Sequence, residues 1–254
     1  MSTADWQIPK GKCILNQNEV NIWRVNAGSV SSSGLKDVLT PDELKKAYGY
    51  YFLKDQENFI ISRGLLRVLI ARYLNTSPLQ INIHFNKYGK PYLKKSEGNL
   101  KFNVSHSNGT LLFAFTRNQE IGIDIEYIQH DFADLEIARH FFSRAEILAL
   151  SVLPEDARVI GFFNCWTRKE AYIKAIGRGL SIPLDSFDVS VVPGETAELV
   201  RVHNNSGGSK HWRIVDLEVG GKFSAALAVK GNPNEIKYYE WTDEMYSNSS
   251  SLQG

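Results

Sequence analysis

Apolar and polar positions follow two kinds of pattern along this chain, and together they predict a protein built from both strands and helices. Alternation with a period of two is typical of half-buried strands. It marks the short segments 21–25, 81–85, 102–105, 111–116 and 121–125. Apolar stripes at helical spacing run over about 57–74 and 158–176. We therefore expect an α+β fold.

Two helix-start signals indicate an internal repeat. Thr40-Pro41-Asp42-Glu43 combines a Thr N-cap, a Pro at the first helical position and a Glu three residues after the cap. Ser143-Arg144-Ala145-Glu146 repeats the cap and its Glu 103 positions later. The same shift relates Phe59 to Phe162, Ile70 to Ile173, Ile22 to Ile125 and Arg67 to Glu170, and segment 109–116 resembles 221–228 at a shift of 112. Chance matching of common capping patterns is the alternative explanation.

The repeat predicts two similar α/β lobes in a pseudo-twofold arrangement, with a ligand cleft between them. We place the first lobe at residues 1–120 and the second at 121–242. The tail 243–254 carries a run of Ser and Asn, a composition that predicts disorder.

The net charge of +1 conceals a division between these halves. Residues 1–120 hold 16 Lys+Arg and 9 Asp+Glu, a charge of +7, and the remaining residues hold 13 and 19, a charge of −6. This asymmetry argues against a nucleic-acid-binding protein with one overall basic field. It favours two halves with different electrostatic tasks.

The composition is that of an ordinary globular protein, with 43% hydrophobic and 22% charged residues among 254. Cys13 and Cys165 are the two cysteines, so neither a disulfide framework nor a four-cysteine zinc site is available. The sequence shows no signal-peptide pattern and no apolar run of membrane-spanning length. We expect a cytoplasmic enzyme or binding protein without a membrane partner.

Two carboxylates on one predicted strand are the first candidates for chemistry. In Gly122-Ile123-Asp124-Ile125-Glu126 the side chains of Asp124 and Glu126 share one face. Residues two apart on a strand lie about 6.5–7 Å apart, so both carboxylates can reach one divalent cation, which prefers oxygen ligands. The alternative is a half-buried strand with a charged solvent face.

The second predicted long helix supplies the next candidates. Trp166, Glu170 and Lys174 are spaced four apart and form one helical face. Glu170 can supply a third carboxylate, while Lys174 binds a phosphate nearby. The alternative is an aromatic core contact beside an ordinary Glu–Lys surface pair.

Polar residues at the end of the strand 102–105 form a third group. A Ser–His nucleophilic pair is conceivable at Ser105 and His106, but the sequence has no G-x-S-x-G elbow, and adjacent strand residues point to opposite faces. Phosphate contact by Ser105 or His106 is the better interpretation, with a plain polar turn as the alternative.

Basic residues of the first half can also contact phosphates or simply form a solvated face; these are Arg63, Arg67, Lys87 and Lys90. Neither common nucleotide-binding fingerprint is present.

In their order and spacing these segments resemble a known family, the large, two-lobed, Sfp-like class of 4′-phosphopantetheinyl transferases. The resemblance rests on five blocks: Tyr88-Gly89-Lys90-Pro91, Phe102-Asn103-Val104-Ser105-His106-Ser107, Gly122-Ile123-Asp124-Ile125-Glu126, Trp166-Thr167-Arg168-Lys169-Glu170-Ala171-Tyr172-Ile173-Lys174 and Gly177-Arg178-Gly179-Leu180. Segment 181–187 continues the similarity, so it covers about residues 88–187. Outside that span the likeness is one of pattern.

The resemblance implies a fold, a reaction and its partners. The enzyme would have the pseudo-twofold fold of this family. It would transfer the 4′-phosphopantetheine of coenzyme A to a serine of an apo acyl or peptidyl carrier protein, releasing adenosine 3′,5′-bisphosphate. It would use Mg²⁺, for which Mn²⁺ often substitutes. We expect it to act as a monomer.

The resemblance also implies roles for individual residues. Asp124, Glu126 and Glu170 match the metal ligands. Glu170 is our candidate for the base that takes the serine proton, either directly or through metal-bound water. Lys174 matches the lysine near the pyrophosphate, and it counts with Glu170 as catalytic. Lys90, Ser105 and His106 match positions that hold coenzyme A phosphates, and Lys46 matches another coenzyme A contact. Glu43 stands where relatives carry a basic residue, so Arg63 or Arg67 are candidates to hold the outer phosphate instead.

Two other functions remain to be distinguished from the transferase. One is a coenzyme A-binding scaffold that has lost catalysis, which the intact Asp124, Glu126, Glu170 and Lys174 disfavour. The other is a Mg²⁺-dependent phosphodiester hydrolase, which the lack of further clustered His and Asp residues disfavours. Fatty-acid, polyketide and nonribosomal-peptide carriers all stay open as partners.

Overall fold

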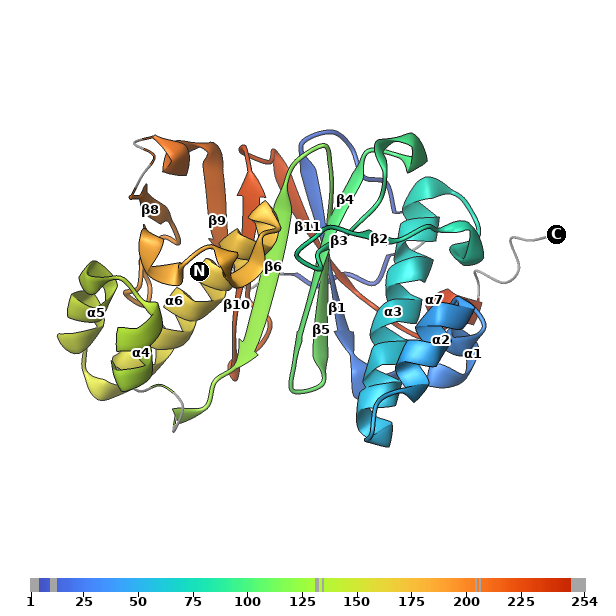
Figure 1. The fold of residues 1–254 in the computed structure, drawn as a ribbon, viewed down its shortest axis with the longest axis horizontal. Coiled ribbons are helices and arrows are strands. Elements are labelled where there is room, and N and C mark those ends of the chain that lie inside the picture. The colour runs from blue at the N-terminus through green and yellow to red at the C-terminus, as the bar shows by residue number, and fades with distance from the viewer. Residues whose placement is uncertain are drawn as a thin grey trace.

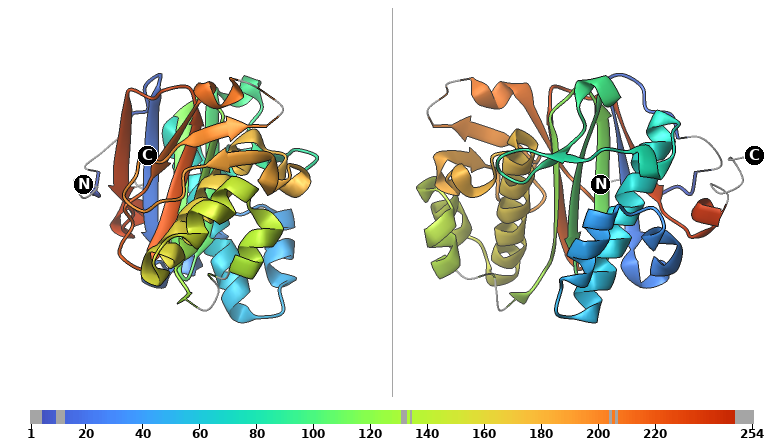
Figure 2. Two further views of the ribbon diagram at one scale, coloured as in Figure 1. Left: turned by 90° about the vertical axis from the view of Figure 1, so that its left-hand side faces the viewer. Right: turned by 45° about the vertical axis from the view of Figure 1, so that its right-hand side comes forward.

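Two β-sheets stacked face to face form the centre of the protein, and helices cover the outer face of each (Figure 1). The computed structural model describes residues 5–9, 13–130, 133, 135–203, 205 and 207–247. The right-hand view of Figure 2 again shows the strands between the two groups of helices. The α+β class and the two-lobed arrangement predicted from the sequence are confirmed.

The first sheet has the strand order β11-β1-β5-β4. Its strands are β1 (Glu19–Asn26), β4 (Leu100–Ser107), β5 (Thr110–Arg117) and β11 (Glu235–Glu240). β1 runs parallel to β11, and the other pairs are antiparallel. The helices of this half are α1 (Ser32–Lys36), α2 (Pro41–Tyr48) and α3 (Leu53–Leu74), and a two-residue pair, β2 (His84–Phe85) and β3 (Pro91–Tyr92), follows.

The second sheet has the strand order β6-β10-β9, all antiparallel. Its strands are β6 (Ile121–Tyr127), β9 (Trp212–Asp216) and β10 (Phe223–Lys230). The helices of this half are α4 (Leu135–Phe141), α5 (Arg144–Ser151) and α6 (Glu155–Ile176), beside the small pair β7 (Phe187–Val189) and β8 (Leu199–Val202). Short 3₁₀ turns connect these elements at Ala27–Ser29, Pro78–Gln80, Lys95–Glu97, Gly179–Ser181, Leu184–Ser186 and Gly208–His211.

Strand alternation decides which side chains enter which core. In β1, Ile22 packs into the apolar layer between the sheets, whereas Trp23 packs toward α3. In β6, Ile123 and Ile125 enter the same middle layer. Because neighbouring strand residues point to opposite faces, the other side of β6 presents its polar side chains toward α6. The core thus fixes the face on which the carboxylates of β6 lie.

The repeat is present, with a different register in the long helices. α2 and α5 begin and end 103 residues apart, but α3 and α6, each 22 residues long, lie 102 apart because the connection before α6 is one residue shorter. The shift of 103 is therefore wrong for the helical pairs. Arg67 corresponds to Lys169 and not to Glu170: each is buried and forms an ion pair with the capping-box Glu of the preceding helix, Glu43 or Glu146.

The C-terminal segment returns to the first half of the molecule. β11 pairs with β1, although the sequence placed residues 235–242 in the second lobe. The predicted disorder of 243–254 is wrong where the chain is described, because α7 (Glu244–Ser247) follows and Met245 is buried in the core of the first half. Residues 248–254 lie outside the described part of the chain. The predicted strand 81–85 is also shorter, since β2 holds its last two residues.

Among the described helices, none combines the length and the apolar composition that crossing a bilayer needs.

Candidate active site

A buried carboxylate, Asp124 of β6, lies at the centre of the candidate site. It is 2% exposed. Its Oδ1 accepts hydrogen bonds from Ser105 Oγ of β4 at 2.9 Å and from Lys174 Nζ of α6 at 2.5 Å, and Lys174 Nζ also lies 3.0 Å from Ser105 Oγ. Three residues predicted from separate motifs therefore meet where the two halves join.

The other carboxylate oxygen, Asp124 Oδ2, is buried and has no hydrogen-bond partner among the described residues. Burying an unpaired carboxylate oxygen is costly, and such an atom calls for an explanation. Asp124 Oδ2 is therefore suited to bind a cation that arrives together with a ligand.

Close packing of β6 on α6 brings these groups together. A Cβ atom at Gly122 would lie 2.1 Å from the carbonyl oxygen of Ala171, so only glycine lets the strand approach the helix this closely. On its other sides α6 is held by Arg168, which is fully buried and pairs with Asp216, and by Lys169. The helix is therefore fixed about its axis with Lys174 facing Asp124.

Glu170 and Glu126 stand in the electrostatic field of Asp124. Burial, and then the negative charge of Asp124, raise the pKa of Glu170 to about 7, while Lys174 opposes the shift. Burial and Asp124 also raise the pKa of Glu126, against a hydrogen bond of 3.1 Å that Ser107 Oγ donates to Glu126 Oε2. A cation bound beside these carboxyl groups would favour their charged forms and so lower their pKa values.

The predicted metal ligands are thus near one another, but the structure does not assemble them into a metal centre. Within the described part of the chain, no group of three or more His, Cys, Asp or Glu side chains has the geometry of a metal site. The Lys174 ammonium occupies one oxygen of Asp124. The all-oxygen donor set and the unpartnered Asp124 Oδ2 do fit a hard divalent cation.

Lys90 lies elsewhere than beside Asp124. Its Nζ donates to the carbonyl oxygens of Ile121 at 3.0 Å and Ala175 at 2.9 Å, and burial lowers its pKa to about 8. The Asn86 side chain of the same turn donates to the Gly177 carbonyl, so this turn caps the C-terminal end of α6 (Figure 1). Lys90 joins the two halves in addition to any contact with coenzyme A.

His106 follows Ser105 on β4, and its electrostatic environment includes the central cluster. Partial burial and the positive charge of Lys174 lower the pKa of its imidazole, while Asp124 opposes the shift. His106 is therefore close enough to Lys174 and Asp124 for their charges to affect the protonation of its imidazole.

Lys46 and Arg63 form a separate basic group in the first half. Lys46 Nζ lies 5.4 Å from the centre of the Phe59 ring, and the Arg63 guanidinium lies 5.8 Å from it. Arg63 Nη1 is buried without a hydrogen-bond partner among the described residues. Arg67 is excluded as a phosphate ligand, because its 3% exposed side chain is bound to Glu43 and to two backbone carbonyls.

A small cavity opens beside Glu126. It has a volume of about 220 Å³ and is lined by Glu126, Tyr127, Gln129, Phe163 and Trp166. The sequence predicted Trp166 on the helical face of Glu170 and Lys174, but Ser107 was not predicted as a partner of Glu126. The alternation of β4 carried that signal, since Ser107 lies two residues after Ser105 and on the same face.

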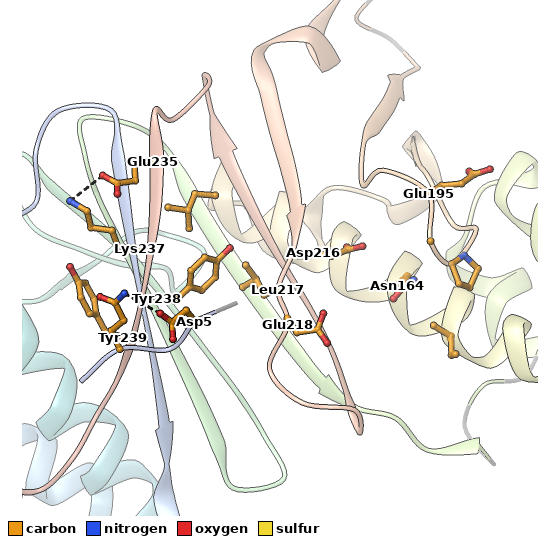
Figure 3. A pocket seen from close by; sticks show the side chains of 15 residues that line it. Asp5, Asn164, Glu195, Asp216, Leu217, Glu218, Glu235, Lys237, Tyr238 and Tyr239 are labelled. Carbon is orange, nitrogen blue, oxygen red and sulfur yellow. Dashed lines mark hydrogen bonds and ion pairs between the residues drawn. The ribbon is translucent and has the colours of Figure 1, made fainter. Parts of the chain in front are cut away.

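A larger cleft of about 870 Å³ lies at the opposite edges of the two sheets, between β9 and β11 (Figure 3). Its lining is acidic, with Asp5, Glu195, Asp216, Glu218 and Glu235 beside Lys237. Asp216 is neutralised by Arg168, and Lys237 by Glu235. This cleft lacks the combination of buried carboxylate, lysine and serine found at Asp124, so size alone does not make it the active site.

Comparison with known proteins shows the family to which the chain belongs. Residues 120–228 match the family model of the 4′-phosphopantetheinyl transferase superfamily, and residues 29–116 match that of the 4′-phosphopantetheinyl transferase N-terminal domain. The chain is 33% identical to the 4′-phosphopantetheinyl transferase HetI of Nostoc sp., over 89% of this chain and 94% of that protein. It is 35% identical to the 4′-phosphopantetheinyl transferase Sfp of Bacillus subtilis, over 59% of this chain and 66% of that protein. The matches cover both halves and include the motifs of β4, β6 and α6, so this chain belongs to the 4′-phosphopantetheinyl transferase superfamily as an Sfp-like member.

Proposed function

We propose that the cluster around Asp124 catalyses transfer of the 4′-phosphopantetheine of coenzyme A to a serine of an apo carrier protein. This proposal rests on one observation, the bonding of the buried Asp124. Its Oδ1 accepts hydrogen bonds from Lys174 and Ser105, and its Oδ2 has no hydrogen-bond partner among the described residues. The family membership of the chain supports the reaction, and favours it over a hydrolase or an inactive scaffold.

The reaction is a displacement at the β-phosphorus of coenzyme A. The carrier serine Oγ forms a new bond to this phosphorus, and the bond from the phosphorus to the bridging oxygen breaks. Adenosine 3′,5′-bisphosphate leaves with the bridging oxygen and its electron pair, and the serine proton passes to a base. The nucleophile belongs to the partner, which accounts for the lack of a nucleophilic elbow in this chain.

Glu170 is the proposed base. In the metal-free protein, burial and then the charge of Asp124 raise its pKa to about 7, so its carboxylate can take a proton near neutral pH. Lys174 and Ser105 then hold phosphate oxygens and stabilise the charge that develops on the leaving group.

Mg²⁺, or Mn²⁺ in its place, is the proposed cofactor, held by Asp124, Glu126 and Glu170. The donor set is all oxygen, as this ion prefers, and Asp124 Oδ2 is free to serve. When bound, the ion neutralises charge on the pyrophosphate oxygens.

The other phosphate contacts are distributed over the first half. We propose that Lys46 and Arg63, which flank Phe59, hold the outer phosphate together with His106. An ammonium has three protons, and Lys90 gives two of them to carbonyl groups, which leaves one for a phosphate oxygen. The monomeric state, the cytoplasmic location and the absence of nucleic-acid and membrane partners stay predictions from the sequence, as does the type of carrier.

The direct test is to incubate the protein with coenzyme A, Mg²⁺ and apo carriers of the fatty-acid, polyketide and nonribosomal-peptide types, and to weigh each carrier by mass spectrometry. We expect one carrier type at least to gain the phosphopantetheine mass. Unmodified carriers of all three types with a folded enzyme would overturn the proposal. Glu170→Gln should abolish the gain, and Glu155→Gln, an exposed Glu at the start of the same helix, is the matched control that should not.

A further inference from the structure

The joint between the two halves is formed by side chains of β4. β4 and β6 are outer strands of different sheets. From alternate positions of β4, Lys101 pairs with Glu120 at 2.9 Å, Asn103 Oδ1 accepts the Ile123 N–H at 2.8 Å, Ser105 donates to Asp124, and Ser107 contacts Glu126. We call Lys101, Asn103, Ser105 and Ser107 the β4 ladder. It replaces a backbone ladder at this edge and places each polar residue of β6 opposite a partner from the first half.

Ser107, the last member of the β4 ladder, has a defined hydrogen-bond pattern. Its Oγ accepts the Tyr127 N–H at 3.0 Å, and its own proton is directed to Glu126 Oε2 at 3.1 Å. A hydroxyl has one proton to donate, so the bond from Tyr127 helps to fix which way that proton points. Among the described residues, this is the hydrogen bond that holds the Glu126 carboxylate.

We infer that Ser107 is a positioning residue, which orients the Glu126 carboxylate for the divalent cation although it comes from the other half of the chain. The inference rests on the proposed metal role of Glu126. A Glu side chain at the end of a strand has three rotatable bonds, and a partner that fixes its terminal group lowers the entropy that is lost when a ligand binds. Ser107 itself need not touch coenzyme A or the reacting atoms.

The test measures metal binding rather than turnover. Mn²⁺ is titrated into the enzyme with coenzyme A and without a carrier protein, and free Mn²⁺ is followed by electron paramagnetic resonance. Partners of metal ligands typically change metal affinity by about 10- to 100-fold. We expect Ser107→Ala to weaken Mn²⁺ binding by about tenfold. Ser107→Thr keeps the hydroxyl, so its Mn²⁺ affinity should stay within about twofold of the wild type. The control is Ser151→Ala at an exposed serine of α5, which should bind Mn²⁺ like the wild type.

A double-mutant cycle separates this inference from the proposed function. Glu126→Gln should weaken Mn²⁺ binding, and adding Ser107→Ala to it should weaken binding no further, because the hydroxyl then has no carboxylate to orient. If Glu126→Gln weakens binding and Ser107→Ala does not, the positioning role is overturned and the proposed function stands. If Glu126→Gln binds Mn²⁺ like the wild type, both the metal role of Glu126 and the inference fall.

Kinetics give a second readout that a purely structural role would not move. Excess Mg²⁺ should restore most of the turnover of Ser107→Ala, because a weakened metal site fills at higher concentration, and the KM for coenzyme A at saturating Mg²⁺ should be unchanged. A turnover defect that no Mg²⁺ concentration relieves would contradict the positioning role.

Discussion

The two halves of the molecule have the same framework but opposite contents at corresponding positions. On β1, Asn21 and Trp23 lie on the face toward α3, as Asp124 and Glu126 of β6 lie on the face toward α6. Instead of a charged cluster, Asn21 Nδ2 and Trp23 Nε1 donate to the buried Tyr73 hydroxyl at 3.0 and 2.8 Å. The first half has a neutral hydrogen-bonded core where the second has carboxylates.

The helices differ in the same way. Glu170 of α6 corresponds to Val68 of α3, which is 2% exposed, and Lys174 corresponds to Arg72. Arg72 donates to the Met245 carbonyl and stacks on Trp241, so the C-terminal segment covers this face. The comparison shows that the repeat provides the same framework twice, whereas the buried carboxylates occur only in the copy whose strand lies beside β4 of the other half.

The largest expected difference between the two halves is in the effect on turnover of substituting the corresponding residues Glu170 and Val68. Glu170→Ala should lower the turnover number by about 10³-fold, since a general base contributes about 10² to 10⁴, with the fold intact. Val68→Ala should leave turnover within about twofold of the wild type and lower the free energy of unfolding by about 2 kcal/mol through a cavity. Steady-state kinetics and urea unfolding measure the two. Near-wild-type turnover of Glu170→Ala would remove the chemical role assigned to the second half.

The buried ion pairs at corresponding positions test whether the two halves are stabilised in the same way. Lys169 is fully buried against Glu146, and Arg67 is 3% exposed against Glu43. Removing one partner of such a pair leaves the other charge uncompensated, so Lys169→Met and Arg67→Met should each cost about 3–5 kcal/mol of stability. Only Lys169→Met should also lower turnover, because Lys169 precedes Glu170. Stability losses that differ by more than about 2 kcal/mol would show that the pairs are not equivalent.

The C-terminal segment 241–245 covers the face of the first half that corresponds to the candidate site, and substituting Trp241 tests that role. Trp241 is 3% exposed and packs against Trp23 with ring centres 6.3 Å apart. Trp241→Ala should cost about 3 kcal/mol of stability as a large cavity opens, while the KM for coenzyme A stays unchanged. Unfolding curves and initial rates with varied coenzyme A check this. A raised KM would place the segment in the binding machinery instead.

Most of the fold and the centre of the site could be predicted from the sequence. The capping boxes at Thr40 and Ser143 are local signals, and both are formed in the structure. The alternation of β6 placed Asp124 on the polar face, and the resemblance to a family linked it with Ser105 and Lys174. Each capping box depends on contacts within four residues, so the local sequence specifies it.

The remaining features depend on contacts between distant segments. The one-residue difference that pairs Arg67 with Lys169 lies in a connection whose length the apolar pattern does not fix. The return of β11 to β1 is a pairing between ends of the chain, and strand alternation is the same for either sheet. The position of Lys90 depends on backbone carbonyls of two other elements, and no residue pattern encodes those.

The dependence of stability on pH distinguishes Glu170 from Val68. In the metal-free enzyme the folded pKa of Glu170 is about 7, above its ordinary value of 4.5. Between these values the unfolded chain has lost the proton that the folded chain keeps, so stability falls as pH rises from about 4.5 to about 7.

Glu170→Gln should remove this part of the slope, at most about 3 kcal/mol over the whole window, and Val68→Ala should leave the slope unchanged. Urea unfolding in EDTA at several pH values measures it. A Glu170→Gln curve parallel to that of the wild type would mean that Glu170 does not carry the raised pKa. Mg²⁺ binds the carboxylate form, so adding it should stabilise the wild type most above pH 7. That gain links the chemistry of the second half to the folding of the whole molecule.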